Sequence, residues 1–116
     1  MKKVYLTQCG QFAARHGHGG TLAEASHEHN FHYEITFYGP LNEEGYLVDF
    51  RVLQDFFTKK INTRLHHADL NSLFSNPTTE TLAIWLFERV QAKFPFVYSV
   101  KVAEESDRWI EYRGEE

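Results

Sequence analysis

The sequence predicts an α+β fold of two layers, in which two helices cover one face of a four-stranded antiparallel sheet. Stretches near both ends of the chain alternate apolar and polar residues at the period of a strand, whereas two central stretches carry apolar residues three and four positions apart, at the period of a helix. The resulting order is ββααββ, and short links between sequential strands favour antiparallel pairing. Such a sheet has exposed edges that a symmetric assembly could pair.

The first strand is predicted over Lys3 to His16, and a second begins at His27 after a glycine-rich connection. Asp49 is placed to cap the first helix, and the segment 76–80 has the proline and hydroxyl residues of a helix start, with that helix running to Lys93. A third strand follows Pro95 and a fourth covers 108–113. The apolar faces expected in the core are Phe50, Leu53, Phe57, Ile61 and Leu65 of the first helix; Ala83, Leu86, Val90 and Phe94, widened by Leu82 and Trp85, of the second; and Tyr98, Val100 and Val102 of the third strand.

The size and composition of the chain predict one globular domain over residues 1–116. The net charge of −4 argues against a general binder of nucleic acid or of anionic membranes, because both require a positive face. The stretch 4–12 is interrupted by polar residues and offers neither a signal-peptide core nor a membrane span. A lone cysteine, Cys9, cannot form a disulfide within the chain, so we expect a cytoplasmic protein.

Three histidines are predicted to gather at one end of the first two strands. His27 and His29 point to the same side of the second strand, and His16 ends the more apolar face of the first. In an antiparallel pair the end of one strand lies beside the start of the next, so the three imidazoles would meet. Catalytic Zn²⁺ takes three protein ligands and keeps one position open, although copper, nickel or iron would also accept imidazoles. His18 has the parity of His16 and could replace it, and an ordinary core or surface role is the alternative for each histidine.

An acid, Glu104, ends the apolar stripe of the predicted third strand. Because it has the parity of Val100 and Val102, we expect its carboxylate to point toward the cavity that holds the histidines. A solvated strand end is the alternative.

Short motifs are spread in order along nearly the whole chain. They are Phe12-Ala13-Ala14-Arg15-His16, His27-Glu28-His29-Asn30-Phe31, Val48-Asp49-Phe50, Leu65-His66-His67 with Leu70-Asn71, Asn76-Pro77-Thr78-Thr79-Glu80, and Val102-Ala103-Glu104 with Trp109-Ile110-Glu111-Tyr112. Together they resemble the 6-pyruvoyl-tetrahydropterin synthase and 6-carboxy-tetrahydropterin synthase family. The resemblance implies the tunnelling fold, in which subunits close a barrel as trimers and two trimers stack, with active sites between subunits. It also implies a zinc ion held by His16, His27 and His29, and a pterin substrate such as 7,8-dihydroneopterin triphosphate.

The resemblance implies further roles around the substrate. Glu104 would anchor the pterin ring by accepting hydrogen bonds from its amino and N–H groups. Thr78 and Thr79 would complete the pterin pocket, and both can also cap the helix that starts there. His67 matches a relay histidine, but His66 stands where the family has the aspartate that orients it. Glu28 likewise stands where the family has a glycine.

The general base is the main departure from the family pattern. The usual cysteine before the paired histidines is absent from residues 21–26. A subgroup of the family carries glutamate instead, in the pattern Glu-x-x-His-x-His, and is associated with cleavage of the side chain to 6-hydroxymethyl-dihydropterin, a folate precursor. Glu24 matches that glutamate and is the expected base, with an exposed loop glutamate as the alternative.

The sequence therefore predicts a zinc-dependent pterin synthase-like lyase that assembles as a trimer or a dimer of trimers. One alternative is a 6-carboxy-tetrahydropterin synthase of queuosine biosynthesis. Another is a non-catalytic pterin-binding or metal-binding paralogue, because both the cysteine and the relay aspartate are missing. A cupin-type metal enzyme with Glu34 as its acid ranks third, since two helices interrupt the strands. Cations that could hold a triphosphate are Arg15, Arg64 and Lys101, and the sequence does not choose among them.

Overall fold

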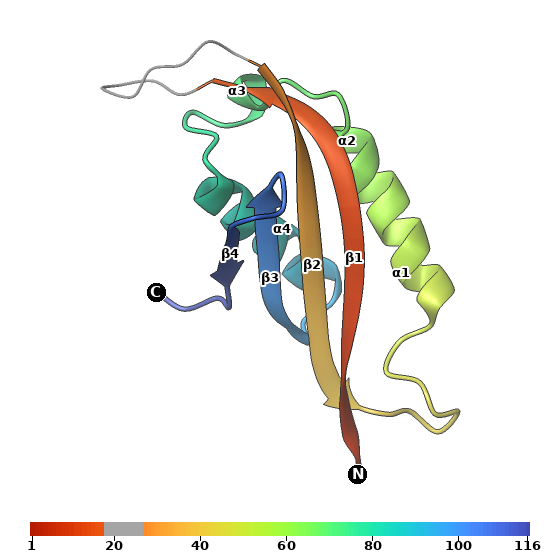
Figure 1. Cartoon of the computed structure of the whole chain (residues 1–116). Coiled ribbons are helices and arrows are strands. Elements are labelled where there is room, and N and C mark those ends of the chain that lie inside the picture. The colour runs from red at the N-terminus through yellow and green to blue at the C-terminus, as the bar shows by residue number, and fades with distance from the viewer. Residues whose placement is uncertain (18–26) are drawn as a thin grey trace.

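The computed structural model describes residues 1–17 and 27–116, apart from the side chain of His27. One layer is a four-stranded antiparallel sheet with its strands in chain order, and the helices lie against one face of that sheet (Figure 1). The predicted fold class is confirmed. The strands are β1 (Lys3–His16), β2 (His27–Pro40), β3 (Val97–Glu104) and β4 (Trp109–Tyr112), and the helical segments are α1 (Phe50–Phe56), η2 (Phe57–Asn62), α2 (Thr63–Leu65), α3 (Leu70–Leu73) and α4 (Thr79–Lys93).

Strands β1 and β2 form a long curved pair whose register is the one that alternation predicts (Figure 1). His16, the last residue of β1, pairs with His27, the first residue of β2, and Ala14 pairs with His29. On the face that the helices cover, Phe12, Phe31 and Ile35 are buried. The pair therefore carries the core along its length and brings the histidine-bearing ends of the two strands together.

The first helical region begins as predicted and then changes type. The Asp49 side chain caps α1 by accepting a hydrogen bond from the backbone N–H of Arg51 at 2.9 Å. The following segment η2 is a π-helix, which the apolar spacing did not predict. Phe50 was predicted in the core but is 70% exposed, and Phe56 is buried instead. That prediction was wrong because the first turn of α1 does not pack on the sheet.

Helix α4 confirms the prediction for the second helix. The Thr78 hydroxyl accepts a hydrogen bond from the backbone N–H of Thr81 at 3.1 Å, and the helix ends at Lys93. Ala83, Leu86 and Val90 are fully buried against the sheet. No helix in the described ranges has both the length and the hydropathy needed to cross a membrane.

A β-bulge changes the parity of β3. Thr36 pairs with Ser99, but Phe37 pairs with Val97, so one extra residue lies between them. That residue, Tyr98, packs with Tyr5 at a ring-centroid distance of 5.3 Å instead of joining the core. The prediction that Tyr98 shares the face of Val100 was wrong, because an inserted residue reverses the alternation on one side of it.

Gly10 provides the space that the ring of Tyr33 occupies on the adjacent strand. A Cβ at Gly10 would overlap the Cζ and hydroxyl oxygen atoms of Tyr33. The Tyr33 side chain is 1% exposed, and its hydroxyl donates to the Asn62 Oδ1 atom at 3.0 Å. Burial raises the pKa of Tyr33 to about 12. The ring is therefore enclosed and has little room to yield.

We therefore expect Gly10→Ala to lower the free energy of unfolding by about 2 to 3 kcal/mol, the cost of overpacking a core. Urea unfolding measures this loss. Gly39→Ala is the matched control on the paired strand, because its Cβ would approach only the tip of the Leu47 side chain, at 3.1 Å. Equal losses in the two variants would show that the contact with Tyr33 is not the cause.

Candidate metal centre

Three side chains from three neighbouring strands meet at one end of the sheet. His16 ends β1, His29 lies near the start of β2, and Glu104 ends β3. The Glu104 Oε1 atom lies 2.7 Å from the Nε2 atom of His29 and 3.4 Å from the Nε2 atom of His16. One ligand atom from each of the three lies within 4.8 Å of the others. His16 is fully buried, whereas His29 and Glu104 are partly exposed, so the cluster opens toward solvent on one side.

The second ring nitrogen of each histidine faces an acceptor. The Nδ1 atom of His16 lies 3.0 Å from the carbonyl oxygen of Pro77, and that of His29 lies 3.3 Å from the Glu105 carboxylate. A carbonyl and a carboxylate only accept, so each Nδ1 carries the hydrogen and donates it. In the neutral ring the lone pair is then on Nε2, which is the atom that faces Glu104.

The Nε2 atoms of two imidazoles and a carboxylate therefore converge on one point, where either a metal cation or a proton on an imidazole balances the charge of the carboxylate. With Zn–N and Zn–O bonds of about 2.0 to 2.2 Å, ligand atoms at the corners of a tetrahedron lie about 3.4 Å apart. The His16 to Glu104 separation of 3.4 Å matches this spacing. The His29 to Glu104 separation of 2.7 Å is shorter and has the length of a charge-assisted hydrogen bond, so Glu104 contacts the imidazole of His29 directly. The Nε2 atoms of His16 and His29 fit two of the ligand positions of a zinc site.

The remaining predicted ligands are placed only in part. The backbone of His27 pairs with His16 at the same end of the sheet, but its side chain is outside the described part of the structure. His18 and Glu24 also lie outside the described residues. Their roles stay predictions.

The segment 77–79 lies against the cluster through the contact between Pro77 and His16. Thr78 and Thr79 are half-buried at the start of α4. The Thr78 hydroxyl caps the helix and lies 3.0 Å from the Thr81 hydroxyl. Capping therefore operates here, and it places both threonines beside the candidate metal ligands.

His67 lies at the outer edge of β1 and is not part of the ligand cluster found in the described residues. Its backbone N–H donates to the Ala13 carbonyl at 2.6 Å, and its side chain is 68% exposed. The Nδ1 atom of His67 lies 3.5 Å from a carboxylate oxygen of Glu28. A carboxylate thus faces this histidine, although it comes from β2, whereas position 66, where the family has the aspartate, directly follows α2.

The sequence did not point to the residues that hold the histidines in place. Asn71 binds the residue after His16, accepting from the Gly17 N–H at 2.8 Å and donating to the Gly17 carbonyl at 3.1 Å. Glu105 reaches His29 because it follows the end of β3 with a φ of 70°, in the left-handed region. Strand alternation does not predict the direction of Glu105, because this residue lies beyond the end of β3. The Pro77 carbonyl belongs to the backbone, so no sequence pattern predicts its contact with His16.

The fold and the site define an α+β protein with a histidine and carboxylate cluster at the end of its sheet, and comparison with known proteins gives its family. The family model for 6-pyruvoyl tetrahydropterin synthase matches residues 5–115, so the chain belongs to that family.

Curated relatives carry more than one activity in their names. Dihydroneopterin monophosphate aldolase of Pyrococcus furiosus is 35% identical over 72 residues, which cover 62% of this chain and 61% of the aldolase. A putative 6-carboxy-5,6,7,8-tetrahydropterin synthase of Archaeoglobus fulgidus is 32% identical over 87 residues, 75% of each chain. The match thus spans about three fifths of the aldolase and three quarters of the synthase.

Solved structures share the fold over almost the whole chain. The 6-pyruvoyl tetrahydropterin synthase of Caenorhabditis elegans has a TM-score of 0.87 at 18% identity, covering 99% of this chain and 98% of that one. A Plasmodium vivax 6-pyruvoyltetrahydropterin synthase, in which a catalytic glutamate is replaced by alanine, has a TM-score of 0.77 at 13% identity, covering 97% and 98%. At these identities the likeness concerns the fold alone.

Proposed function

We propose that the chain is a zinc-dependent lyase that acts on 7,8-dihydroneopterin triphosphate or a related dihydropterin and releases 6-hydroxymethyl-dihydropterin. The observation that carries this proposal is the convergence of the Nε2 atoms of His16 and His29 with the carboxylate of Glu104. Held by His16 and His29 together with His27, a zinc ion would supply Lewis acidity beside the hydroxylated side chain of a pterin. Pro77 and Glu105 fix the orientation of the two described imidazoles, as outer-shell partners do in zinc sites.

Glu104 anchors the pterin ring in this proposal. In the structure its carboxylate contacts the imidazoles, but it ends a strand and is 29% exposed, so it can turn away from them. Once the Nε2 lone pairs bind the metal, the carboxylate can accept hydrogen bonds from the amino and ring N–H groups of a pterin. Two such bonds in one plane would fix the orientation of the ring.

Glu24 is the proposed general base. The pattern Glu-x-x-His-x-His ends on His29, a described member of the metal cluster. The Plasmodium vivax relative has a catalytic glutamate, and the Pyrococcus furiosus relative is an aldolase. Both names are compatible with a glutamate base and with cleavage of a carbon–carbon bond.

Glu28 supplies the carboxylate for His67 in this proposal. It faces the Nδ1 atom of His67 at 3.5 Å, so it favours the tautomer with the hydrogen on Nδ1. Two departures from the family pattern, Glu28 for glycine and His66 for aspartate, then compensate each other. We further propose a homo-oligomer, a trimer or a dimer of trimers, in which the outer edges of β1 and β4 are paired and the pterin binds between subunits.

Product analysis tests this function. Zinc-loaded protein is incubated separately with the triphosphate and the monophosphate of 7,8-dihydroneopterin, and the products are identified by mass. The expected product is 6-hydroxymethyl-dihydropterin, formed faster from the preferred substrate. A carboxy product would instead support the activity named for the Archaeoglobus fulgidus relative. Unchanged substrate that still binds would support a non-catalytic paralogue.

A further inference from the structure

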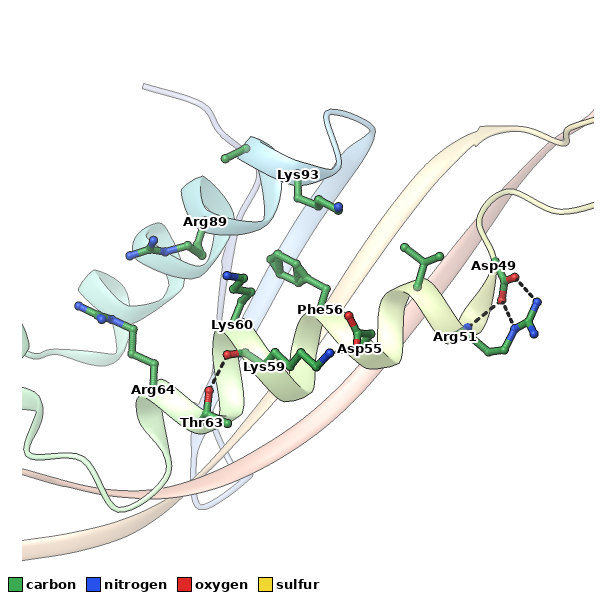
Figure 2. Close-up of a pocket in the computed structure, with 12 residues that line it drawn as sticks. Asp49, Arg51, Asp55, Phe56, Lys59, Lys60, Thr63, Arg64, Arg89 and Lys93 are labelled. Carbon is green, nitrogen blue, oxygen red and sulfur yellow. Dashed lines mark hydrogen bonds and ion pairs between the residues drawn. The ribbon is translucent and has the colours of Figure 1, made fainter.

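A second hollow lies on the helical side of the molecule, away from the metal cluster. It is open, measures about 1160 Å³ and runs between the continuous helical region α1, η2 and α2 on one side and the C-terminal half of α4 on the other (Figure 2). Phe56 lines it together with Val52 and Ala92. The hollow is thus bounded by regular structure on two sides.

The side chains of this groove carry a strong excess of positive charge. Six cations and two acids line it, within a chain whose net charge is −4. Both acids are already engaged: Asp49 with Arg51 at 2.8 Å, which lowers the pKa of Asp49, and Asp55 with Lys59 at 2.8 Å. The other cations, Lys60, Arg64, Arg89 and Lys93, make no ion pair with any described residue.

These four cations line the groove on both walls, and the guanidinium of Arg89 also lies 4.9 Å from the ring centroid of Trp85. Figure 2 shows Lys60 and Arg64 on one helical region and Arg89 and Lys93 on the other. The two cations of each pair are four residues apart. Like charges at this spacing lower the stability of a helix by a few tenths of a kcal/mol. An anion bound between the walls would reverse this cost.

The backbone of the first wall is also unusual. Lys60 belongs to the π-helical segment η2, and such segments occur frequently at functional sites. The hydroxyl of Thr63 donates to the carbonyl of Lys59 at 2.6 Å and so satisfies a carbonyl group of this segment (Figure 2). Lys59, Lys60 and Thr63 all line the groove, so the irregular backbone and the positive charge coincide.

We propose that this groove binds a small anion that carries two or more phosphate groups. Guanidinium and ammonium groups on facing walls suit neighbouring phosphates, since arginine binds phosphate oxygens through two N–H groups and lysine acts as a point charge. A nucleic acid fits less well, because the positive charge is confined to one groove of an acidic chain and forms no long track.

The groove is separate from the candidate metal centre. Helix α4 starts beside His16 through Pro77, whereas Arg89 and Lys93 lie in its last turns. Ten residues separate Thr79 from Arg89, which corresponds to about 15 Å along the helix axis. The wall that carries Arg89 and Lys93 therefore lies away from a substrate bound to the same subunit at the metal cluster. Arg64 on the other wall was one of the cations considered for a substrate triphosphate, and the inference assigns it to the groove instead. The inference does not depend on the proposed function.

Calorimetry with inorganic triphosphate and the full chain, without divalent cations at about 0.05 M salt, tests the inference. We expect binding that weakens as salt is raised. Replacing Lys60 and Arg64 together with glutamine should lower the affinity at least tenfold, because two charge-assisted contacts are lost. The control is the double replacement Lys2→Gln with Arg108→Gln, which removes the same charge from other exposed positions and should change the affinity less than about twofold.

Further measurements separate the sources of phosphate and guard against misfolding. Adenosine triphosphate should bind at least as tightly as inorganic triphosphate, and a tighter fit would identify a nucleotide as the ligand; adenosine monophosphate should bind much more weakly. Triphosphate should raise the Tm of the unaltered chain but not that of the groove variant. The variant His29→Ala should still bind triphosphate. The inference is overturned if triphosphate does not bind, if both double variants bind it equally, if the monophosphate binds as tightly, or if His29→Ala abolishes binding.

Discussion

Replacing His29 with alanine is expected to remove the bound metal and, with it, turnover. The imidazole supplies one of the converging lone pairs, and its Nε2 atom lies nearer to the Glu104 carboxylate than that of His16 does. Loss of an outer-shell partner alone costs about 10- to 100-fold in metal affinity, so loss of a direct ligand should cost more. Metal analysis of purified protein and titration of the metal-free protein with zinc measure the change.

His32→Ala is the matched control for this experiment. His32 lies on the same strand as His29, but alternation places its side chain on the opposite face of the sheet. Its backbone partners in the sheet are Gln11 on β1 and Ala103 on β3. We expect this variant to retain one zinc ion per chain. Full zinc occupancy in His29→Ala would remove His29 from the ligand set and with it the main support for the proposed function.

Replacing Glu24 with glutamine is expected to lower the rate of turnover by about 10²- to 10⁴-fold, the usual contribution of a positioned general base. Glutamine keeps the size of the side chain but cannot take a proton. Zinc content and the affinity for the dihydropterin should stay within a few-fold of the unaltered protein, because other residues hold both. Single-turnover measurements with the triphosphate separate the chemical step from binding.

Cys9→Ser is the companion variant, since Cys9 is the single cysteine of the chain. It is exposed in the middle of β1, on the strand face opposite to His16 and the buried Phe12 and Ala14. It should therefore leave the rate unchanged. Loss of turnover in Cys9→Ser with normal turnover in Glu24→Gln would reject the glutamate base and restore a cysteine mechanism.

Local patterns were sufficient for most of the fold. Alternation and a short connection were enough to predict β1 and its pairing with β2. The capping residue Thr78 was enough to predict where α4 starts. The patterns failed where one residue is inserted without a change of composition. The bulge beside Tyr98 is such a place, and so is η2, since the buried Phe57 and Ile61 keep the spacing of an ordinary helix.

The candidate site was predictable where strand parity controls it and not elsewhere. His16, His29 and Glu104 each sit at a strand end, so alternation brought them to one face. Glu105 and Asn71 act from a turn and a short helix whose positions depend on the folded chain. The approach of Glu28 to His67 joins two segments that are far apart in the sequence, and no single motif contains such a contact.

The outer edge of β1 is divided into two unequal parts. In the described ranges, the hydrogen bonds from segment 66–69 reach only Ala13 and Arg15 on that edge. Among the described residues, no backbone group of another segment bonds to the stretch 3–11 on this edge, although the side chain of Gln8 donates to the Cys9 carbonyl at 2.9 Å. A strand of a second molecule can continue the sheet there. Because segment 66–69 already occupies Ala13 and Arg15, it limits the register in which a strand of a second molecule can pair with β1. A neighbouring molecule would therefore end beside the metal cluster without covering it.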